Sequence, residues 1–353
     1  MRILNTGYLL VAYASLNVIV LLSIFISPSI FWPSLFLAYL VVPLFFLNLL
    51  VCVVFFVRKP RRASSLLILC FVIVALPLVS KVCRRPKAPH DTTGSISILN
   101  HNVKLFRKSG VYNQFSGELI EWIAKDSSDI KCIQEFSTNS RWKELDIQSK
   151  IESAGYFSFI YKASSEIYGE HNPGMAIFSK YPILEAGLVD SNDEGINSMI
   201  YSDLLLGQDT IRIYNVHLTS YMFDQISPDD SFVEKRIKAL QRVINTVAIH
   251  TNEIELLMKH MKLTNHPVLI AGDFNEVSLS YNLNRLSSLN NAFEERGGGF
   301  GFTLSMLPLF LKIDHILLSK EFNIQRYDVD YTMDISDHYP QRCWFEIKDW
   351  KNY

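Results

Sequence analysis

The chain has 353 residues and a formal net charge of −1 at pH 7, but its charges are distributed unevenly. Before residue 93 there are nine basic residues and one acidic residue, Asp91, so the remaining sequence has 25 basic and 34 acidic residues, a net charge of −9. This composition argues against a protein that holds DNA by broad phosphate neutralisation, which needs clustered Lys and Arg. It does not exclude a nuclease, because a divalent cation can supply the local positive charge.

Three apolar stretches precede residue 83, at about residues 8–26, 35–57 and 66–82, and their one charged side chain is Lys81 near the end of the third. Each is about long enough to cross a hydrocarbon core of ~30 Å as a helix. We therefore predict that residues 1–83 form a membrane anchor with three transmembrane helices. The alternatives are a cleaved signal peptide, for which residues 27–31 are a poor cleavage site, and a buried helical hairpin, which a soluble fold can rarely accommodate.

The basic residues around these stretches predict their orientation. The first loop, residues 27–34, is uncharged, whereas residues 58–62 carry four basic side chains, so the second loop is expected in the cytoplasm. Four further basic residues within 81–87 favour the opposite orientation. We expect an integral membrane protein whose catalytic domain is extracytoplasmic. Residues 84–94, with two prolines and Gly94, are typical of a linker, and residues 95–353 form the second domain.

From Ser95 onward, short strand-like runs alternate with helical ones, which predicts an α/β domain with many strands. Apolar alternation predicts strands at about residues 95–103, 130–133, 174–178, 199–206, 210–216, 268–270, 313–318 and 343–347. A short helix is expected at 118–125. The longest helix is predicted at 232–261, where Ile237, Leu240, Ile244 and Val247 recur at helical spacing.

Polar residues stand where these strands end, which makes one convergent site plausible. They are Asn102, Glu135, His217, Asp273, Asn275, Asp314, Asp337 and His338. Carboxylate and amide oxygens are the ligands that Mg²⁺ prefers. A His with a carboxylate partner can take a proton from water, and a second His or an amide can stabilise charge on a phosphate. Singly these signals are weak, because Gly272–Asn275 could be an ordinary turn and His217 an ordinary core histidine.

As an ordered set, these residues resemble the pattern of the endonuclease/exonuclease/phosphatase superfamily, which includes deoxyribonuclease I, apurinic endonucleases and neutral sphingomyelinases. The run Gly174–Ile183 also resembles a strand and turn common in that family. The similarity extends from about Ser97 to Phe345 and omits none of the signature positions.

The resemblance implies a four-layer α/β sandwich, in which two packed, mainly antiparallel sheets lie between helices. It also implies metal-dependent hydrolysis of a phosphoester by in-line attack of water, with Mg²⁺ or Mn²⁺ as cofactor. The implied metal ligands are Asn102, Glu135 and Asp337. The implied catalytic residues are His338 as base, Asp314 as its orienting partner, and His217, Asp273 and Asn275 around the phosphate. The division of labour between Asp273 and His338 stays open.

The substrate cannot be chosen from the fold, since one fold hosts several chemistries. The apolar segment 304–311 beside Asp314 could contact lipid or pack in the core. We therefore expect a phosphoester substrate, either nucleic acid or a phospholipid head group, with the lipid bilayer as the other partner and no protein partner. His315 is expected on the opposite face of its strand from Asp314, and residues 171–172 could contact substrate or lie in a loop. The alternative function is a non-catalytic, membrane-bound scaffold that retains the fold.

Overall fold

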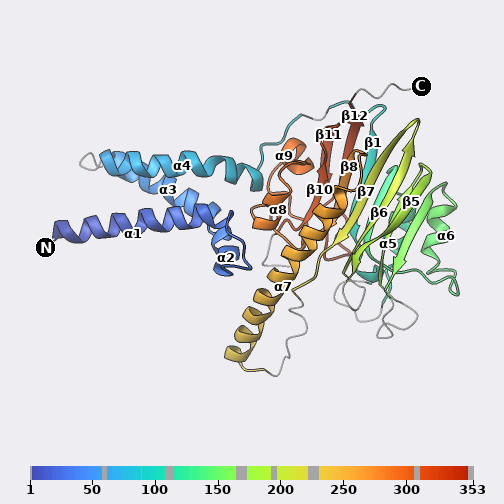
Figure 1. The fold of residues 1–353 in the computed structure, drawn as a ribbon, viewed down its shortest axis with the longest axis horizontal. Helices are drawn as coiled ribbons and strands as arrows, with labels where there is room; N and C mark the ends of the chain where they lie inside the picture. Colours follow the sequence, from blue (N-terminus) through green and yellow to red (C-terminus); the bar gives the residue numbers. More distant parts are fainter. Residues whose placement is uncertain are drawn as a thin grey trace. The chain divides into compact units, whose positions relative to one another are not determined.

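The computed structural model describes residues 2–57, 62–88, 90–107, 114–163, 173–191, 197–221, 230–305 and 311–348 (Figure 1). The basic loop at 58–61, residues 171–172 and most of the apolar segment 304–311 lie outside these ranges. The chain divides into two compact units. One contains the N-terminal helices, the first part of α7 (Phe232–Met261) and α8 (Tyr281–Arg285), and the other contains both sheets.

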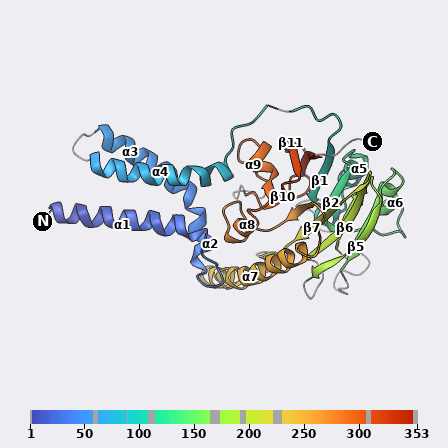
Figure 2. The ribbon, with the colours of Figure 1, turned by 45° about the horizontal axis from the view of Figure 1, so that its top comes forward.

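Four helices make up most of the first unit (Figure 2): α1 (Arg2–Ser23), α2 (Pro33–Tyr39), α3 (Val41–Val57) and α4 (Arg62–Val82). Buried apolar residues of α1, α2 and α3 pack together, among them Val20, Ala38 and Val41. A buried amide pair also joins α1 to α3, since Asn48 donates to Asn17 at 2.6 Å. Many other apolar side chains of these helices are exposed, including Leu9 and Leu50.

The three expected transmembrane helices are not confirmed. Among the described helices, none alone is both long and apolar enough to span a bilayer, and α2 with α3 meets that test only as a pair bent by 48°. The bend falls within the expected span 35–57, at Leu40. Pro43 has no N–H to donate to the carbonyl of Tyr39, which removes a helical hydrogen bond at that point. The first helix ends at Ser23 rather than at residue 26.

The second unit is built on two six-stranded sheets. The first sheet has the order β11-β12-β1-β2-β4-β3. Its strands are β1 (Ile96–Asn102), β2 (Ile130–Phe136), β3 (Phe157–Lys162), β4 (Gly174–Ser179), β11 (Phe322–Val329) and β12 (Gln341–Ile347). One pair, β1–β2, is parallel, and every other pair in this sheet is antiparallel.

The second sheet repeats this plan, with the order β5-β6-β7-β8-β10-β9. Its strands are β5 (Ile183–Ser191), β6 (Ser198–Leu206), β7 (Asp209–His217), β8 (Val268–Asp273), β9 (Asn290–Asn291) and β10 (Asp314–Leu318). Only β7–β8 is parallel. The expectation of two mainly antiparallel sheets is therefore confirmed.

Alternation along the strands creates separate cores on the two faces of the first sheet. Ile98 faces the second sheet, where it joins residues such as Ile213, whereas its neighbour Leu99 packs under helices α5 (Gly117–Lys125) and α6 (Ile147–Glu152). Ser116 caps α5 by accepting from the N–H of Leu119, the expected chemistry of a helix start. The result is the predicted α/β sandwich, with β1 and β2 at its centre.

Candidate active site

The strand arrangement brings the predicted site residues to one edge of the sandwich. Asn102 ends β1 and Glu135 lies near the end of the parallel neighbour β2. In the second sheet, His217 and Asp273 are register partners at the ends of the parallel strands β7 and β8. Asp314 begins β10 directly opposite Asp273, because β10 runs antiparallel to β8. Carboxyl ends of parallel strands meet at the same edge, so the topology itself assembles the site.

Glu135 reaches the site because its strand is irregular there. The pairing of β2 with β4 shifts register between Ile133 and Phe136, and Glu135 has a φ of 50°. A bulge of this kind re-aims a side chain. The preceding Gln134 turns inward instead, and its amide donates to Asn100 at 2.8 Å and to Asn215 of the other sheet at 2.6 Å. This amide bridge fixes the two sheets relative to each other just beneath the site.

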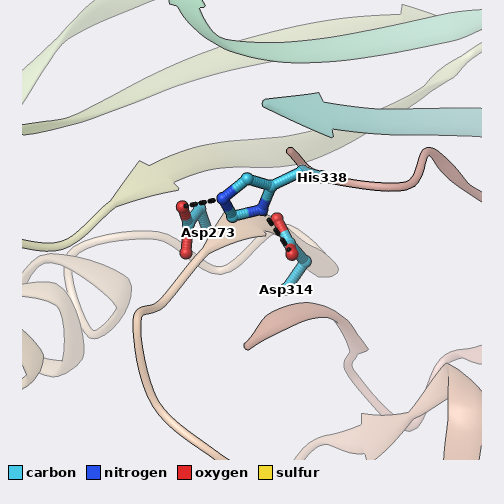
Figure 3. A group of neighbouring side chains, drawn as sticks. All are labelled: Asp273, Asp314 and His338. Carbon is cyan, nitrogen blue, oxygen red and sulfur yellow. Dashed lines mark hydrogen bonds and ion pairs between the residues drawn. The ribbon is translucent and has the colours of Figure 1, made fainter. Parts of the chain in front are cut away.

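His338 lies between two buried carboxylates (Figure 3). Its Nδ1 is 2.9 Å from Oδ2 of Asp314, and its Nε2 is 3.5 Å from Oδ2 of Asp273. The first contact is a hydrogen bond in which Nδ1–H donates to Asp314. This bond fixes the ring orientation and leaves Nε2 as the nitrogen that faces the other carboxylate.

The electrostatics of this group are dominated by burial and by the pairing of charges. Burial alone would lower the pKa of His338, but the charges of Asp314 and Asp273 and the bond to Asp314 together raise that pKa well above the ordinary value. Burial raises the pKa of Asp273, and the charge of Asp314 adds to the rise while His338 opposes it. Strongly perturbed pKa values of this kind are common among groups that transfer protons at functional sites.

Asp273 also contacts two other predicted site residues, Asn102 and His217. The amide nitrogen of Asn102 donates to Oε1 of Glu135 and to Oδ2 of Asp273, both at 3.1 Å. His217 Nε2 lies 3.7 Å from the same oxygen of Asp273 and 4.0 Å from Glu135. Within the described part of the chain, Nδ1 of His217 is buried with no hydrogen-bond partner. Four of the predicted residues thus come together.

Two predicted residues have different neighbours. The carboxylate of Asp337 accepts from Nζ of Lys104 at 2.5 Å. The backbone N–H of Asn275 donates to Asp273 at 2.9 Å, and its side-chain amide donates to the carbonyl of Leu218 at 3.0 Å. Asn275 therefore fixes the segment that follows His217. Its contact with a phosphate stays a prediction.

Several site residues were not found from the sequence. His101 Nε2 contacts the carbonyl of His338 at 3.0 Å, and burial lowers the pKa of His101 to about 4, so its neutral ring donates to this carbonyl. Thr303 Oγ1 accepts from the backbone N–H of Asp314 at 3.1 Å. Lys312 Nζ donates to the carbonyl of Asp314 at 2.6 Å. The contact of His101 joins segments that are 237 positions apart, so no local sequence signal could have identified it. Thr303 and Lys312 lie 11 and 2 positions from Asp314, but no recognised motif marks them.

His315 is structural, as expected. It is buried on the other face of β10, its Nε2 contacts the carbonyl of Glu276 at 2.8 Å, and its Nδ1 contacts Lys312 at 3.0 Å. Burial, with the adjacent charge of Lys312, lowers the pKa of His315 well below the ordinary value.

Two sets of residues could hold a divalent cation. Ligand atoms of Asp273, Asp314 and His338 all lie within 4.8 Å of one another, but the 2.9 Å hydrogen bond between His338 and Asp314 accounts for that proximity without an ion. Glu135 is the more suitable ligand, because 26% of its side chain is exposed and its carboxylate lies among further acidic groups. A hard cation bound there would offset the like charges that burial brings together.

Two packed mixed sheets, with an Asp–His pair and clustered carboxylates at their shared edge, define a phosphoesterase-type α/β sandwich. The family model for the Endonuclease/Exonuclease/phosphatase family matches residues 99–338, and the chain belongs to this family. Members of the family hydrolyse phosphoester bonds as nucleases and phosphatases, generally with divalent metals. Among curated proteins, no sequence matches this chain.

Solved structures share the fold at low sequence identity. An endonuclease/exonuclease/phosphatase from Beutenbergia cavernae DSM 12333 has a TM-score of 0.53 and 11% identity, and the match covers 72% of each chain. The human Nocturnin catalytic domain with bound sulfate has a TM-score of 0.52 and 15% identity, covering 72% of this chain and 94% of that one. A humanized D. rerio TDP2 has a TM-score of 0.51 and 14% identity, covering 71% and 99%.

Proposed function

We propose that this protein is a divalent metal-dependent phosphoesterase that hydrolyses a phosphodiester or phosphomonoester by in-line attack of water. The observation that carries the proposal is the buried imidazole of His338 between Asp314 and Asp273, next to the contact between Asn102 and Glu135. Every residue type that the reaction needs is present at one edge of the sandwich.

In this mechanism the neutral form of His338, whose Nε2 carries no proton, takes the proton of the attacking water. Asp314 accepts from Nδ1–H, which leaves Nε2 to accept that proton, and its charge stabilises the imidazolium that results. His217 and the amide of Asn102 lie beside Asp273 and supply polar contacts around the phosphate. The preorganised backbone around Asp314 and His338, held by Thr303 and His101, keeps the pair aligned.

Glu135, Asn102 and Asp337 are the residues that would hold Mg²⁺ or Mn²⁺. A bound cation would neutralise charge on the phosphate and orient it for attack. Asn102 would then use its side-chain oxygen, which also accepts from the N–H of Lys104 at 3.1 Å. The exposed fraction of Glu135 and of Asp337, 26% and 19% of each side chain, leaves this part of the site open to solvent.

The substrate is proposed to be a nucleic acid or the head group of a phospholipid. A structure of D. rerio TDP2 complexed with single strand DNA product shares the fold, with a TM-score of 0.50 at 14% identity. This similarity supports a nucleic acid as the substrate. The exposed apolar side chains of the N-terminal helices support association with a bilayer. Such an association would favour a phospholipid as the substrate.

The test is an assay of the purified protein with Mg²⁺ against plasmid DNA, sphingomyelin vesicles and phosphatidylinositol phosphates in parallel. We expect one substrate class to turn over, and Glu135→Gln to lower kcat by at least ~10²-fold and to shift the Mg²⁺ titration. Activity that is unchanged in Glu135→Gln, with an unchanged Mg²⁺ titration, would remove Glu135 from the site.

A further inference from the structure

Lys104 is a cation beside the site that has no role in the proposed mechanism. Its Nζ lies 2.5 Å from Oδ2 of Asp337, and 42% of the Lys104 side chain is exposed against 19% for Asp337. The other oxygen of Asp337 is 3.4 Å from Oγ of Ser336. The ammonium group therefore lies at the solvent side of a carboxylate that is a candidate metal ligand.

The backbone around Lys104 is shaped to present this side chain. Lys104, Leu105 and Phe106 have φ values of 46°, 56° and 56°, a left-handed turn made of residues that disfavour it. Each such residue adds backbone strain, which the surroundings must offset. Leu105 and Phe106 are buried in the core, and the N–H of Arg107 closes the turn on the carbonyl of Lys104 at 2.9 Å. The turn thus holds the Cα of Lys104 two positions after Asn102.

An ammonium and a divalent cation compete for one carboxylate. A cation bound to Asp337 would repel an ammonium group 2.5 Å from the ligand oxygen, so Lys104 would have to withdraw. The four-carbon stem and its exposure allow this movement. Once withdrawn, the ammonium remains within reach of the same site mouth, where the substrate phosphate is a strong alternative partner.

We propose that Lys104 is an internal counter-ion that exchanges partners: it neutralises Asp337, leaves when a divalent cation binds, and then contacts the substrate phosphate. The inference rests on the proposed phosphoesterase function and deepens it. Lys104 would then weaken metal binding and strengthen phosphate binding.

The test uses binding alone, with the full-length protein in detergent. Mn²⁺ is titrated calorimetrically into wild type, Lys104→Met and, as matched control, Lys125→Met, a surface lysine that pairs with Glu121. Lys104→Met should bind Mn²⁺ roughly three- to tenfold more tightly, the scale of a solvent-screened ion pair. Inorganic phosphate titrated into the Mn²⁺-loaded proteins should bind about tenfold more weakly to Lys104→Met. Lys125→Met should match wild type in both titrations.

Lys104→Arg keeps the charge and should return both affinities toward wild type, and Lys104→Gln replaces Lys104→Met if the latter does not fold. Unchanged Mn²⁺ affinity in the neutral variants would overturn the counter-ion role, and unchanged phosphate affinity would overturn the exchange. If wild type hydrolyses no phosphoester but the two titrations change as expected, the proposed function fails while the exchange of partners stands.

Discussion

At the scale of single residues, the site depends on buried charges that stabilise one another. His338 is 6% exposed, and both Asp273 and Asp314 are 1% exposed, so none of them has water to solvate a charge. Removing one member leaves the others buried without their partner, which costs more than the interaction itself contributed. Because the three groups act as a unit, their effects on catalysis should not add.

A double-mutant cycle on His338 and Asp314 tests this unit. His338→Ala should lower kcat by ~10³-fold or more, within the range of a general-base contribution. Asp314→Asn should lower it somewhat less, and the double variant little more than His338→Ala alone, because the carboxylate acts only through the imidazole. The measurement is kcat of all three variants on the preferred substrate. Fully multiplicative losses would show that the two residues act independently, and Asp273 would become the first candidate for the base.

Lys312 should give the protein a measurable pH dependence of stability. Burial lowers the pKa of Lys312 to about 7 in the folded state, whereas an unfolded lysine titrates near ~10.4. Between these values the unfolded chain binds the proton and the folded protein does not, so stability rises with pH. Below about pH 7 both states are protonated, and this contribution is constant.

The measurement is the free energy of unfolding of wild type and of Lys312→Met across this range. The difference should move in favour of wild type as the pH rises above 7, by at most about 1.4 kcal/mol per pH unit. A difference independent of pH would mean that Lys312 stays charged when buried.

At the scale of elements, the sequence predicted the central strands and missed the edges. β1, β2, β4, β7, β8 and β10 were all predicted, and each has buried residues on both faces. β3, β5 and β11 were not predicted, and all three are edge strands. An edge strand is partly exposed and carries more polar residues. The alternation of apolar and polar residues that predicts a strand is therefore weak in its sequence. The helix at 232–261, with a strong apolar period, was predicted with its observed bounds.

The site was predictable for a related reason. Five of the eight predicted residues lie at or next to the end or start of a strand, where a switch from apolar to polar residues is visible in the sequence: Asn102, Glu135, His217, Asp273 and Asp314. The other three, Asn275, Asp337 and His338, lie in the loops outside the strands. Long-range partners such as Lys104 for Asp337 depend on the folded geometry, because 233 positions separate the two residues. The β-bulge that directs the side chain of Glu135 into the site could not be predicted from the sequence either, because the residue with positive φ is not a glycine.

Gly272 is the glycine on which the junction of β7 and β8 depends. A Cβ at this position would lie 1.9 Å from the carbonyl oxygen of Val216, a backbone atom that cannot rotate away. Gly272→Ala should lower the free energy of unfolding by about 2 kcal/mol or more, because the strands would have to separate. Gly117→Ala is the matched control, since no atom lies within 4 Å of its added Cβ.

The effect can be followed by thermal unfolding with near-UV circular dichroism. A clear fall in Tm for Gly272→Ala, with Gly117→Ala near wild type, is the expected result. Equal Tm values for the two variants would show that β8 shifts at little cost.

At the scale of the whole molecule, the proposed location of the catalytic domain rests on the charge around the N-terminal helices. A reporter fused after Tyr353 should register the extracytoplasmic side, and one inserted near residue 61 should register the cytoplasm, because the basic residues at 58–62 stay inside. The measurement is the activity of a compartment-sensitive fusion. A cytoplasmic signal from the fusion after Tyr353 would show that the basic residues at 81–87 set the orientation instead.

The pairing of β1 with β12 makes the folding of the candidate site depend on two segments that are far apart in the chain. β1 must leave its outer edge open until residues 341–347 have emerged from the ribosome, because β12 lies between β1 and β11. His338 enters the site only with that same segment, 237 positions after His101, its contact on β1. A chain that ends before residue 338 lacks His338, the proposed base, and we expect it to be inactive. Such a chain also exposes the unpaired edge of β1, which favours aggregation.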